Sequence, residues 1–182
     1  AKRAPTCQTC HFKEKNHNNS TPTGHLAIIG YFDDEEWADY KKPLLRILKL
    51  YDSNNQPTDK FKSMKESGAL LNKNEYMRLR NEKKEVCLKC HSAFFTNEYF
   101  ITADKTLKEA DKLAAETIKL VENAVTEGKI KPINDLPNSI DILKLYKSES
   151  TVEILLFELI LMQRARTFKG AYHISPEYMH WS

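Results

Sequence analysis

The sequence contains no long apolar run. A helix that crosses a bilayer needs at least about 18 consecutive apolar residues. The most apolar stretch, residues 154–162, is shorter than that and contains Glu158. Only 41% of the residues are hydrophobic, whereas 29% are charged. We therefore predict that the chain has no membrane span and that a bound group adds apolar volume to a lean core.

A concentrated block of positive charge is also missing. Lysine and arginine number 28 against 25 acidic residues, which gives a formal net charge of +3. The lysines are scattered along the chain, whereas a nucleic-acid-binding surface gathers them in one patch. We interpret them as solvated helix faces and expect no nucleic-acid partner.

No segment shows the polar–apolar alternation of a half-buried strand. Between Ala103 and Glu127 apolar residues instead recur at intervals of three and four, which predicts a long amphipathic helix. Further helices are expected over about 33–51, 59–67, 73–88, 139–147 and 151–168. Caps or stops are expected at Asn72, Gly68, Gly128 and Gly170. The predicted fold class is all-α.

Cysteine is scarce, and its placement is the most informative feature. The four cysteines lie in two copies of the pattern C-x-x-C-H, formed by Cys7, Cys10 and His11 and by Cys87, Cys90 and His91. This pattern is the attachment signature of c-type haem. The spacing lets two thiols reach two vinyl groups on one porphyrin edge, and the next histidine becomes the proximal iron ligand. We predict two covalently attached haem c groups.

Two other interpretations of paired cysteines are open. Zinc ribbons also use paired C-x-x-C, but usually with about 15–20 residues between the pairs, whereas Cys10 and Cys87 lie much further apart. A thioredoxin-like dithiol needs a βαβ context, for which the sequence has no strand pattern. The histidine directly after both cysteine pairs favours haem.

The histidines outside the motifs are candidates for distal iron ligands, because six-coordinate haem needs a second axial ligand. They are His17, His25, His173 and His180. An exposed or hydrogen-bonding histidine is the ordinary alternative for each. Methionine ligation is also open, with Met77, Met162 and Met179 available.

His17 lies close in the sequence to the first motif, which makes it a poor distal ligand for the iron of that haem. It follows His11 by six residues, which span about 20 Å at full extension. A path around the rim of the same porphyrin would use nearly all of that length. We therefore expect His17 to ligate a neighbouring haem.

Three segments together resemble one family of multihaem proteins. They are RAPTCQTCHFKEKNH at residues 3–17, CLKCHS at 87–92 and RARTFKGAYHISPEYMHW at 164–181. In order and spacing they resemble the C-terminal haem region of octahaem cytochromes of the hydroxylamine oxidoreductase family. The resemblance implies a multihaem cytochrome c with long C-terminal helices that build a homotrimer. It also implies that the two motifs correspond to the last two of eight.

The resemblance further assigns roles to single residues. His17 and His173 match positions of distal haem ligands. Tyr178 matches the tyrosine that, in the oxidising enzymes, bonds covalently to the catalytic haem of an adjacent subunit, and His180 lies near the same site. A tyrosine buried in an aromatic cluster is the ordinary alternative for Tyr178. Six of the family's motifs are absent from this chain, so further haems are expected on another segment or polypeptide.

These observations lead to one expected function and two alternatives. We expect electron transfer through two haems within an oxidoreductase that acts on hydroxylamine, hydrazine or nitrite. Residues 1–100 form its dihaem-binding region with short helices and loops, and residues 101–182 form a long-helix region with an aromatic, histidine-containing tail. The alternatives are a free-standing dihaem electron carrier and a zinc-binding interaction module.

The expected cofactor also bears on location and partners. Haem c is attached outside the bacterial cytoplasm, so we expect the periplasm or an equivalent compartment. The chain shows no signal peptide at Ala1, as expected of a processed product or a fragment. The expected partners are other haem-bearing segments or subunits and small electron-carrier proteins.

Overall fold

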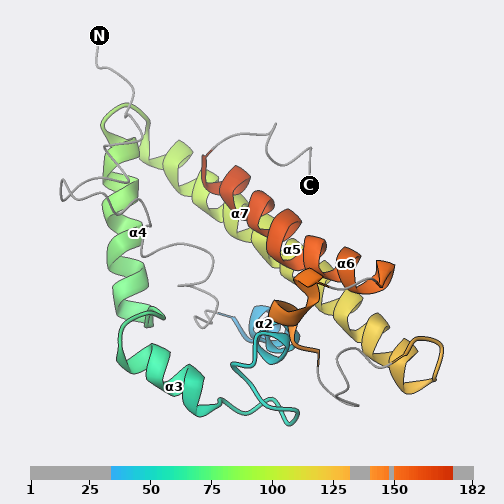
Figure 1. Ribbon diagram of the computed structural model, residues 1–182. Coiled ribbons are helices and arrows are strands. Elements are labelled where there is room, and N and C mark those ends of the chain that lie inside the picture. Colours follow the sequence, from blue (N-terminus) through green and yellow to red (C-terminus); the bar gives the residue numbers. More distant parts are fainter. Residues whose placement is uncertain (1–33, 132–139, 148–149, 174–182) are drawn as a thin grey trace.

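The fold is helical throughout the part of the chain that the structure describes. A computed structural model describes residues 34–131, 140–147 and 150–173 (Figure 1). Within these ranges there is no strand, and the single β-bridge joins Tyr51 to Pro57. The predicted all-α class is therefore confirmed for the described residues.

Eight helical elements follow one another along these residues. They are α2 (Glu35–Ile47), α3 (Asp59–Glu66), α4 (Lys73–Leu88), α5 (Ala93–Thr126), the 3-10 helix η2 (Ile142–Lys147), α6 (Thr151–Phe157), the π-helical segment η3 (Glu158–Gln163) and α7 (Arg164–His173). The predicted caps at Asn72 and Gly128 are confirmed: the Asn72 side chain accepts from the Glu75 backbone N–H at 2.9 Å, and Gly128 turns the chain at a φ of 70°.

α2 begins close to the predicted start at about residue 33 but ends earlier than expected. The Asp34 carboxylate accepts a hydrogen bond from the Trp37 backbone N–H at 2.5 Å and caps the first turn. The helix stops at Ile47, because Lys49 takes a left-handed conformation with a φ of 57°. The predicted extension to Tyr51 is therefore wrong. Pro43 lies within the helix and does not divide it.

α5 begins ten residues before the predicted start at Ala103. The Ser92 hydroxyl accepts from the Phe95 backbone N–H at 3.2 Å and so caps a 34-residue helix. The sequence pattern did not extend this far because the first turns expose large apolar side chains. Phe94 is 77% exposed and Ile101 is also exposed. α5 therefore runs without a break from the predicted dihaem-binding region, which ends at residue 100, into the predicted long-helix region, which begins at residue 101.

The C-terminal helices form one continuous rod instead of the single α-helix predicted over residues 151–168. α6 passes through the π-helical η3 into α7, which continues to His173. The predicted stop at Gly170 is wrong. Gly170 is buried inside α7, and its neighbours Phe168 and Ala171 pack in the core. Tertiary packing therefore outweighs the low helix propensity of glycine.

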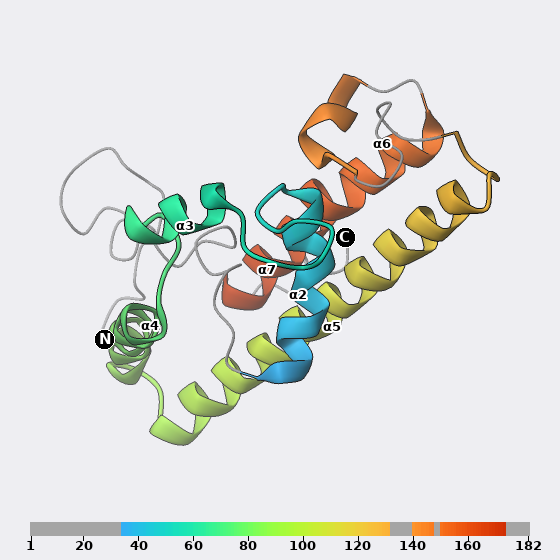
Figure 2. The same cartoon turned by 90° about the horizontal axis from the view of Figure 1, so that it is seen from below.

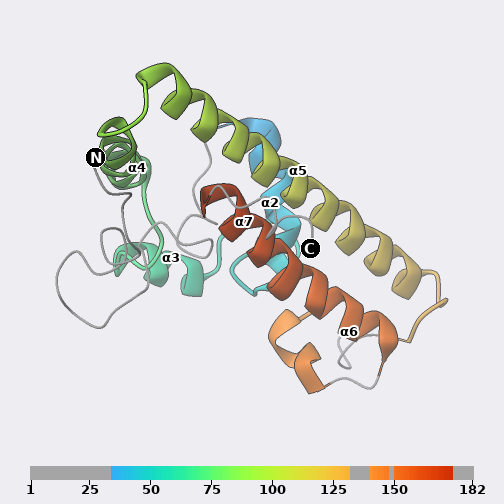
Figure 3. The same ribbon diagram turned by 90° about the horizontal axis from the view of Figure 1, so that it is seen from above.

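α5 is the element on which the others pack. α2 crosses it, and the α6–η3–α7 rod runs beside it in three views (Figures 1–3). α4 leaves the start of α5 at a sharp turn and diverges from it (Figure 1). The larger core cluster joins α2, α5, η2, α6 and η3, and includes Leu45, Ile47, Ile118, Ile142 and Leu156. None of the described helices is both long and apolar enough to cross a membrane.

In a buried cluster of charged and aromatic residues, side chains of α2 and α7 bind a carboxylate of α5. The Asp111 carboxylate accepts from Trp37 Nε1 at 2.7 Å and from Arg164 Nε at 2.5 Å. Lys41 Nζ lies 4.1 Å from the centre of the Trp37 ring. Lys41 and Asp111 are each only 2% exposed. Burial lowers the pKa of Lys41 to about 8, against an ordinary value of 10.5.

This lowered pKa predicts that the folded protein gains stability as the pH rises from about 8 to 10.5. In that range the unfolded chain keeps the Lys41 proton that the folded chain has lost, so higher pH favours folding by about 3 kcal/mol in total. Urea unfolding at pH 7.5 and 9.5 measures the gain. Lys41→Met should remove most of it, and an equal gain in parent and variant would contradict the assignment.

Candidate haem-binding site

The second C-x-x-C-H motif lies at the end of α4 and in the turn before α5. Cys87 belongs to the last turn of α4, and its carbonyl oxygen accepts from the backbone N–H groups of Cys90 and His91 at 3.0 and 2.9 Å. The motif therefore forms a compact turn. Because that turn also precedes α5, the position of the motif is set by two helices.

The reactive groups of this motif face a surface that a cofactor can reach. Cys90 and His91 are exposed and Cys87 is half-buried. The His91 ring stacks on Phe95, with ring centres 4.7 Å apart and planes 24° apart. Phe95 therefore supports one face of the imidazole.

Large apolar side chains are exposed beside the motif. Leu88 and Phe95 are about half exposed, and Phe94 is more exposed than either. Apolar side chains gathered at the surface commonly mark a site that a ligand or partner covers. Two thiols at the attachment spacing, an exposed imidazole and apolar surroundings form a donor set that fits a covalently attached haem.

The other predicted site residues are distributed unevenly over the structure. Those outside the described residues are Cys7, Cys10, His11, His17, His25, Tyr178 and His180. His173 is described as the last residue of α7. Met77 on α4 and Met162 on η3 are partly exposed, and Met179 lies outside the described residues.

The fold brings the end of α7 to the start of α5. The Tyr99 hydroxyl donates a hydrogen bond to the carbonyl oxygen of Ala171. Tyr99 lies about two helical turns, or roughly 10 Å, from the Ser92 cap. His173 and the second motif therefore lie at the same end of α5, although they are far apart in the sequence.

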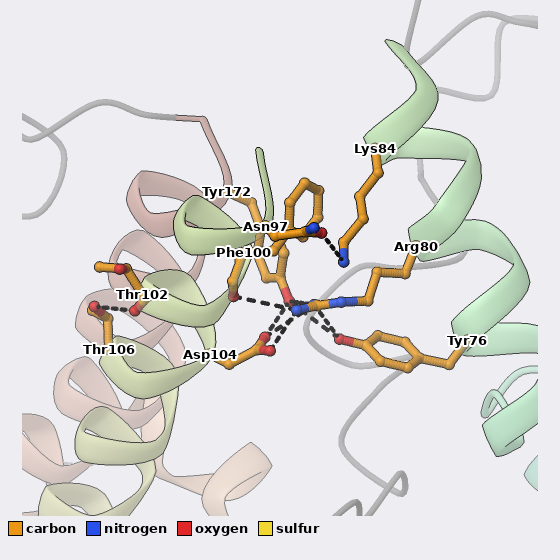
Figure 4. A network of polar contacts seen from close by, with 9 residues as sticks. All are labelled: Tyr76, Arg80, Lys84, Asn97, Phe100, Thr102, Asp104, Thr106 and Tyr172. Carbon is orange, nitrogen blue, oxygen red and sulfur yellow. Dashed lines mark hydrogen bonds and ion pairs between the residues drawn. The ribbon is translucent and has the colours of Figure 1, made fainter. Parts of the chain in front are cut away.

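A buried polar network, which we call the Arg80 network, lies between the two. It consists of Tyr76 and Arg80 on α4, Asp104 on α5 and Tyr172 on α7 (Figure 4). Arg80 Nη1 lies 3.0 Å from Asp104 Oδ1 and 3.0 Å from the Tyr76 hydroxyl. Arg80 Nη2 donates to the carbonyl oxygen of Phe100 at 3.2 Å. With the Tyr172 hydroxyl at 3.3 Å, the guanidinium binds four groups, and its own side chain is largely shielded from solvent.

The hydroxyl groups of the two tyrosines in the Arg80 network lie near each other and near the Asp104 carboxylate. The hydroxyl oxygens of Tyr76 and Tyr172 lie 3.3 Å apart, and Tyr172 donates to Asp104 Oδ1 at 3.2 Å. Burial raises the pKa of both tyrosines, and the nearby Asp104 carboxylate raises them further. Both phenols therefore stay protonated at neutral pH and act as hydrogen-bond groups.

Cations surround the aromatic rings next to this network. Arg80 lies 4.8 Å and Lys84 5.5 Å from the centre of the Phe100 ring, and Lys83 lies 5.8 Å from that of Tyr172. Lys84 Nζ also donates to the Asn97 side-chain oxygen at 3.0 Å. Lys83 and Lys84 therefore place positive charge on α4 before Cys87, which suits an anionic group such as a haem propionate, whereas the Arg80 charge is paired with Asp104.

Sequence analysis did not identify the Arg80 network. The sequence predicted a helix over residues 73–88, and its lysines were interpreted, like the others, as part of solvated helix faces. The available indication was the spacing of Tyr76, Arg80 and Lys84, which puts an aromatic ring and two cations on one side of α4. The partner Asp104 lies 24 residues away in the sequence and Tyr172 lies 92 residues away.

Comparisons with known proteins add no assignment. No protein family model, no curated protein and no solved structure matches the chain. Within the described residues, no three His, Cys, Asp or Glu side chains are grouped so that they could hold a metal ion. A four-cysteine zinc site would need Cys7 and Cys10, which lie outside those residues, so this alternative stays open.

Proposed function

We propose that the chain carries electrons through two covalently bound c-type haems as part of a hydroxylamine oxidoreductase-like multihaem enzyme. The observation that carries this proposal is the Cys87–His91 motif. Its thiols and imidazole occur at the spacing of a haem attachment site, in a compact turn surrounded by exposed apolar side chains. The second copy of the pattern, at Cys7–His11, extends the proposal to two haems.

The chain's own residues hold, orient and shield the cofactor in this proposal. Cys87 and Cys90 form the thioether links, and His91 ligates the iron while its ring rests on Phe95. His17 and His173 are the proposed distal ligands, with His25 and His180 as further candidates. Haem c supplies one-electron redox chemistry when it is bound.

The proposed assembly is a homotrimer formed by α5. Leu113 is 58% exposed and Leu120 69% exposed. With Ala110, Thr117 and Ala124 they follow a spacing of three and four residues along one side of the helix. Such a seam is typical of helices that pair with other helices. α2 and α7 pack against a different face of α5, which leaves this seam for another subunit.

The proposed substrates are small nitrogen compounds: hydroxylamine, hydrazine or nitrite. This part of the proposal rests on the resemblance of residues 164–181 and on Tyr178, which would link to a catalytic haem of an adjacent subunit. The enzyme acts outside the cytoplasm and exchanges electrons with small carrier proteins. The second candidate function is a free-standing dihaem electron carrier, for which the two C-x-x-C-H motifs are sufficient without a catalytic haem.

Covalent haem attachment predicts two haem masses on the chain after expression with a cytochrome c maturation system. Cys87→Ser together with Cys90→Ser should leave one haem, because each motif attaches its own cofactor. Intact-protein mass spectrometry under denaturing conditions measures the number. Cys7→Ser with Cys10→Ser is the matched variant and should also leave one. An unmodified parent chain that carries zinc would contradict the proposal.

The α5 seam predicts that charge at its centre separates the subunits. Leu113→Lys with Leu120→Lys should convert a trimer into a monomer, since burying two lysines per subunit is unfavourable. Ile101→Lys is the control, because Ile101 is an exposed apolar residue of α5 outside the seam. Sedimentation equilibrium measures the mass. A seam variant that stays trimeric would rule out this interface.

Because of the proposed link to a catalytic haem, we expect Tyr178→Phe to lose catalysis selectively. In the assembled holoenzyme it should abolish oxidation of hydroxylamine or hydrazine while the haem content stays unchanged, because the phenol oxygen forms the proposed link. Tyr40→Phe, which changes a half-buried tyrosine on α2, should leave the rate unchanged. Steady-state oxidation assays test both variants. An active Tyr178→Phe enzyme would disprove the crosslinking role.

A further inference from the structure

The Arg80 network connects the two parts of the chain that carry candidate iron ligands. Arg80 lies on α4 two helical turns before Cys87, and Tyr172 directly precedes His173 on α7. Residues seven positions apart share one face of a helix, so Arg80 and Cys87 face the same way from α4. The network is therefore attached at one end to the haem motif and at the other to His173.

The contacts within the network restrain three helices at one point. Arg80 donates to Asp104 on α5 at 3.0 Å and to the Tyr172 hydroxyl on α7 at 3.3 Å. The Tyr172 hydroxyl in turn donates to Asp104 at 3.2 Å. The triangle is closed, since each of the three groups contacts the other two (Figure 4). A displacement of any one helix would therefore break at least two contacts.

Burial makes these contacts hard to replace. Arg80 is 8% exposed, and the Phe100 and Tyr172 rings pack against each other with centres 6.2 Å apart. Water reaches the partly exposed Asp104 carboxylate but cannot easily replace a lost partner of the buried Arg80 side chain. A surface ion pair would allow the helices to drift, whereas a buried, hydrogen-bonded pair holds one geometry.

α4 also contacts the other helices through an apolar cluster, in which Tyr76 packs with Leu107 and Phe168. It diverges from α5 after the motif turn, and its contacts with α5 are much less extensive than those of α2 or α7 (Figure 1). Hydrogen bonds join α4 to the other helices as well: Lys84 binds Asn97, and Tyr76 and Arg80 belong to the Arg80 network. The network therefore helps to set the angle of the helix that carries Cys87.

We propose that Arg80, Asp104 and Tyr172 are positioning residues that hold the Cys87–His91 motif and His173 in one fixed relation, so that His173 meets an iron in ligating geometry. This inference rests on the proposed function, because it takes haem attachment and ligation by His173 as given. None of the three residues contacts the iron in this account. They act through the helices on which they lie.

The test compares variants of the holoprotein in its native assembly. Tyr172→Phe removes the hydroxyl and keeps the ring, so the aromatic packing survives. Asp104→Asn removes the charge that Arg80 faces, and Asp104→Glu restores it. The control is Glu122→Gln, which weakens the ion pair between Arg46 on α2 and Glu122 on α5, away from the motif. Ferric electron paramagnetic resonance and near-infrared magnetic circular dichroism report the axial ligands of each haem.

The expected result is loss of the bis-histidine low-spin signal of one haem in Tyr172→Phe and in Asp104→Asn. A shifted low-spin or a high-spin signal should replace it, as in a His173→Ala variant. Asp104→Glu and Glu122→Gln should keep the parent spectrum. Because Tyr172→Phe leaves Arg80 and Asp104 paired, it remains informative if Asp104→Asn does not fold.

Two outcomes would overturn the inference. In the first, Tyr172→Phe and Asp104→Asn unfold at a lower temperature but keep the parent spectrum, which would make the network purely structural. In the second, His173→Ala also keeps the parent spectrum, which would remove the ligand that the network is proposed to position. Failure of the proposed function itself is separate, since mass spectrometry would then find no haem on the parent chain.

Discussion

The fold depends on two carboxylates of α5 that are each paired with a cation, the buried Asp111 and the partly exposed Asp104. Asp104 and Asp111 lie seven residues apart on one side of the helix, where Arg80 from α4 and Arg164 from α7 reach them. Removing one partner of a buried ion pair commonly costs about 3–5 kcal/mol, because the other charge is left without compensation. The two pairs therefore specify which helices lie against α5 and at which position along its axis.

This arrangement explains how a chain with a modest hydrophobic content keeps a defined helix packing. The apolar core holds α2, α5 and the α6–η3 part of the rod together around Leu45 and Ile118. A second apolar cluster, which includes Tyr76, Leu107 and Phe168, joins α4, α5 and α7, whereas Phe94 and Phe95 beside the Cys87–His91 motif are exposed. A haem bound there would cover Phe94 and Phe95 and complete the packing that the protein alone leaves open.

Sequence patterns predicted the parts of the structure that depend on local chemistry. Asn72 and Gly128 act through contacts within a few residues, so their roles were predictable. The start of α5 was not, because Phe94 and Phe95 are exposed and hide the amphipathic pattern. The C-x-x-C-H pattern is recognisable in the sequence because its five residues are contiguous. The Arg80 network was missed because its members come from three helices, and Gly170 stays helical for reasons of packing that no local pattern contains.

The central claim is that Cys87, Cys90 and His91 hold a haem iron at the turn between α4 and α5. Anomalous diffraction from crystals of the holoprotein, recorded on both sides of the iron and zinc absorption edges, tests it directly. We predict an iron peak bonded to the His91 imidazole, with porphyrin density joined to Cys87 and Cys90. A zinc peak shared with the cysteines of the first motif, or no metal at His91, would contradict the account.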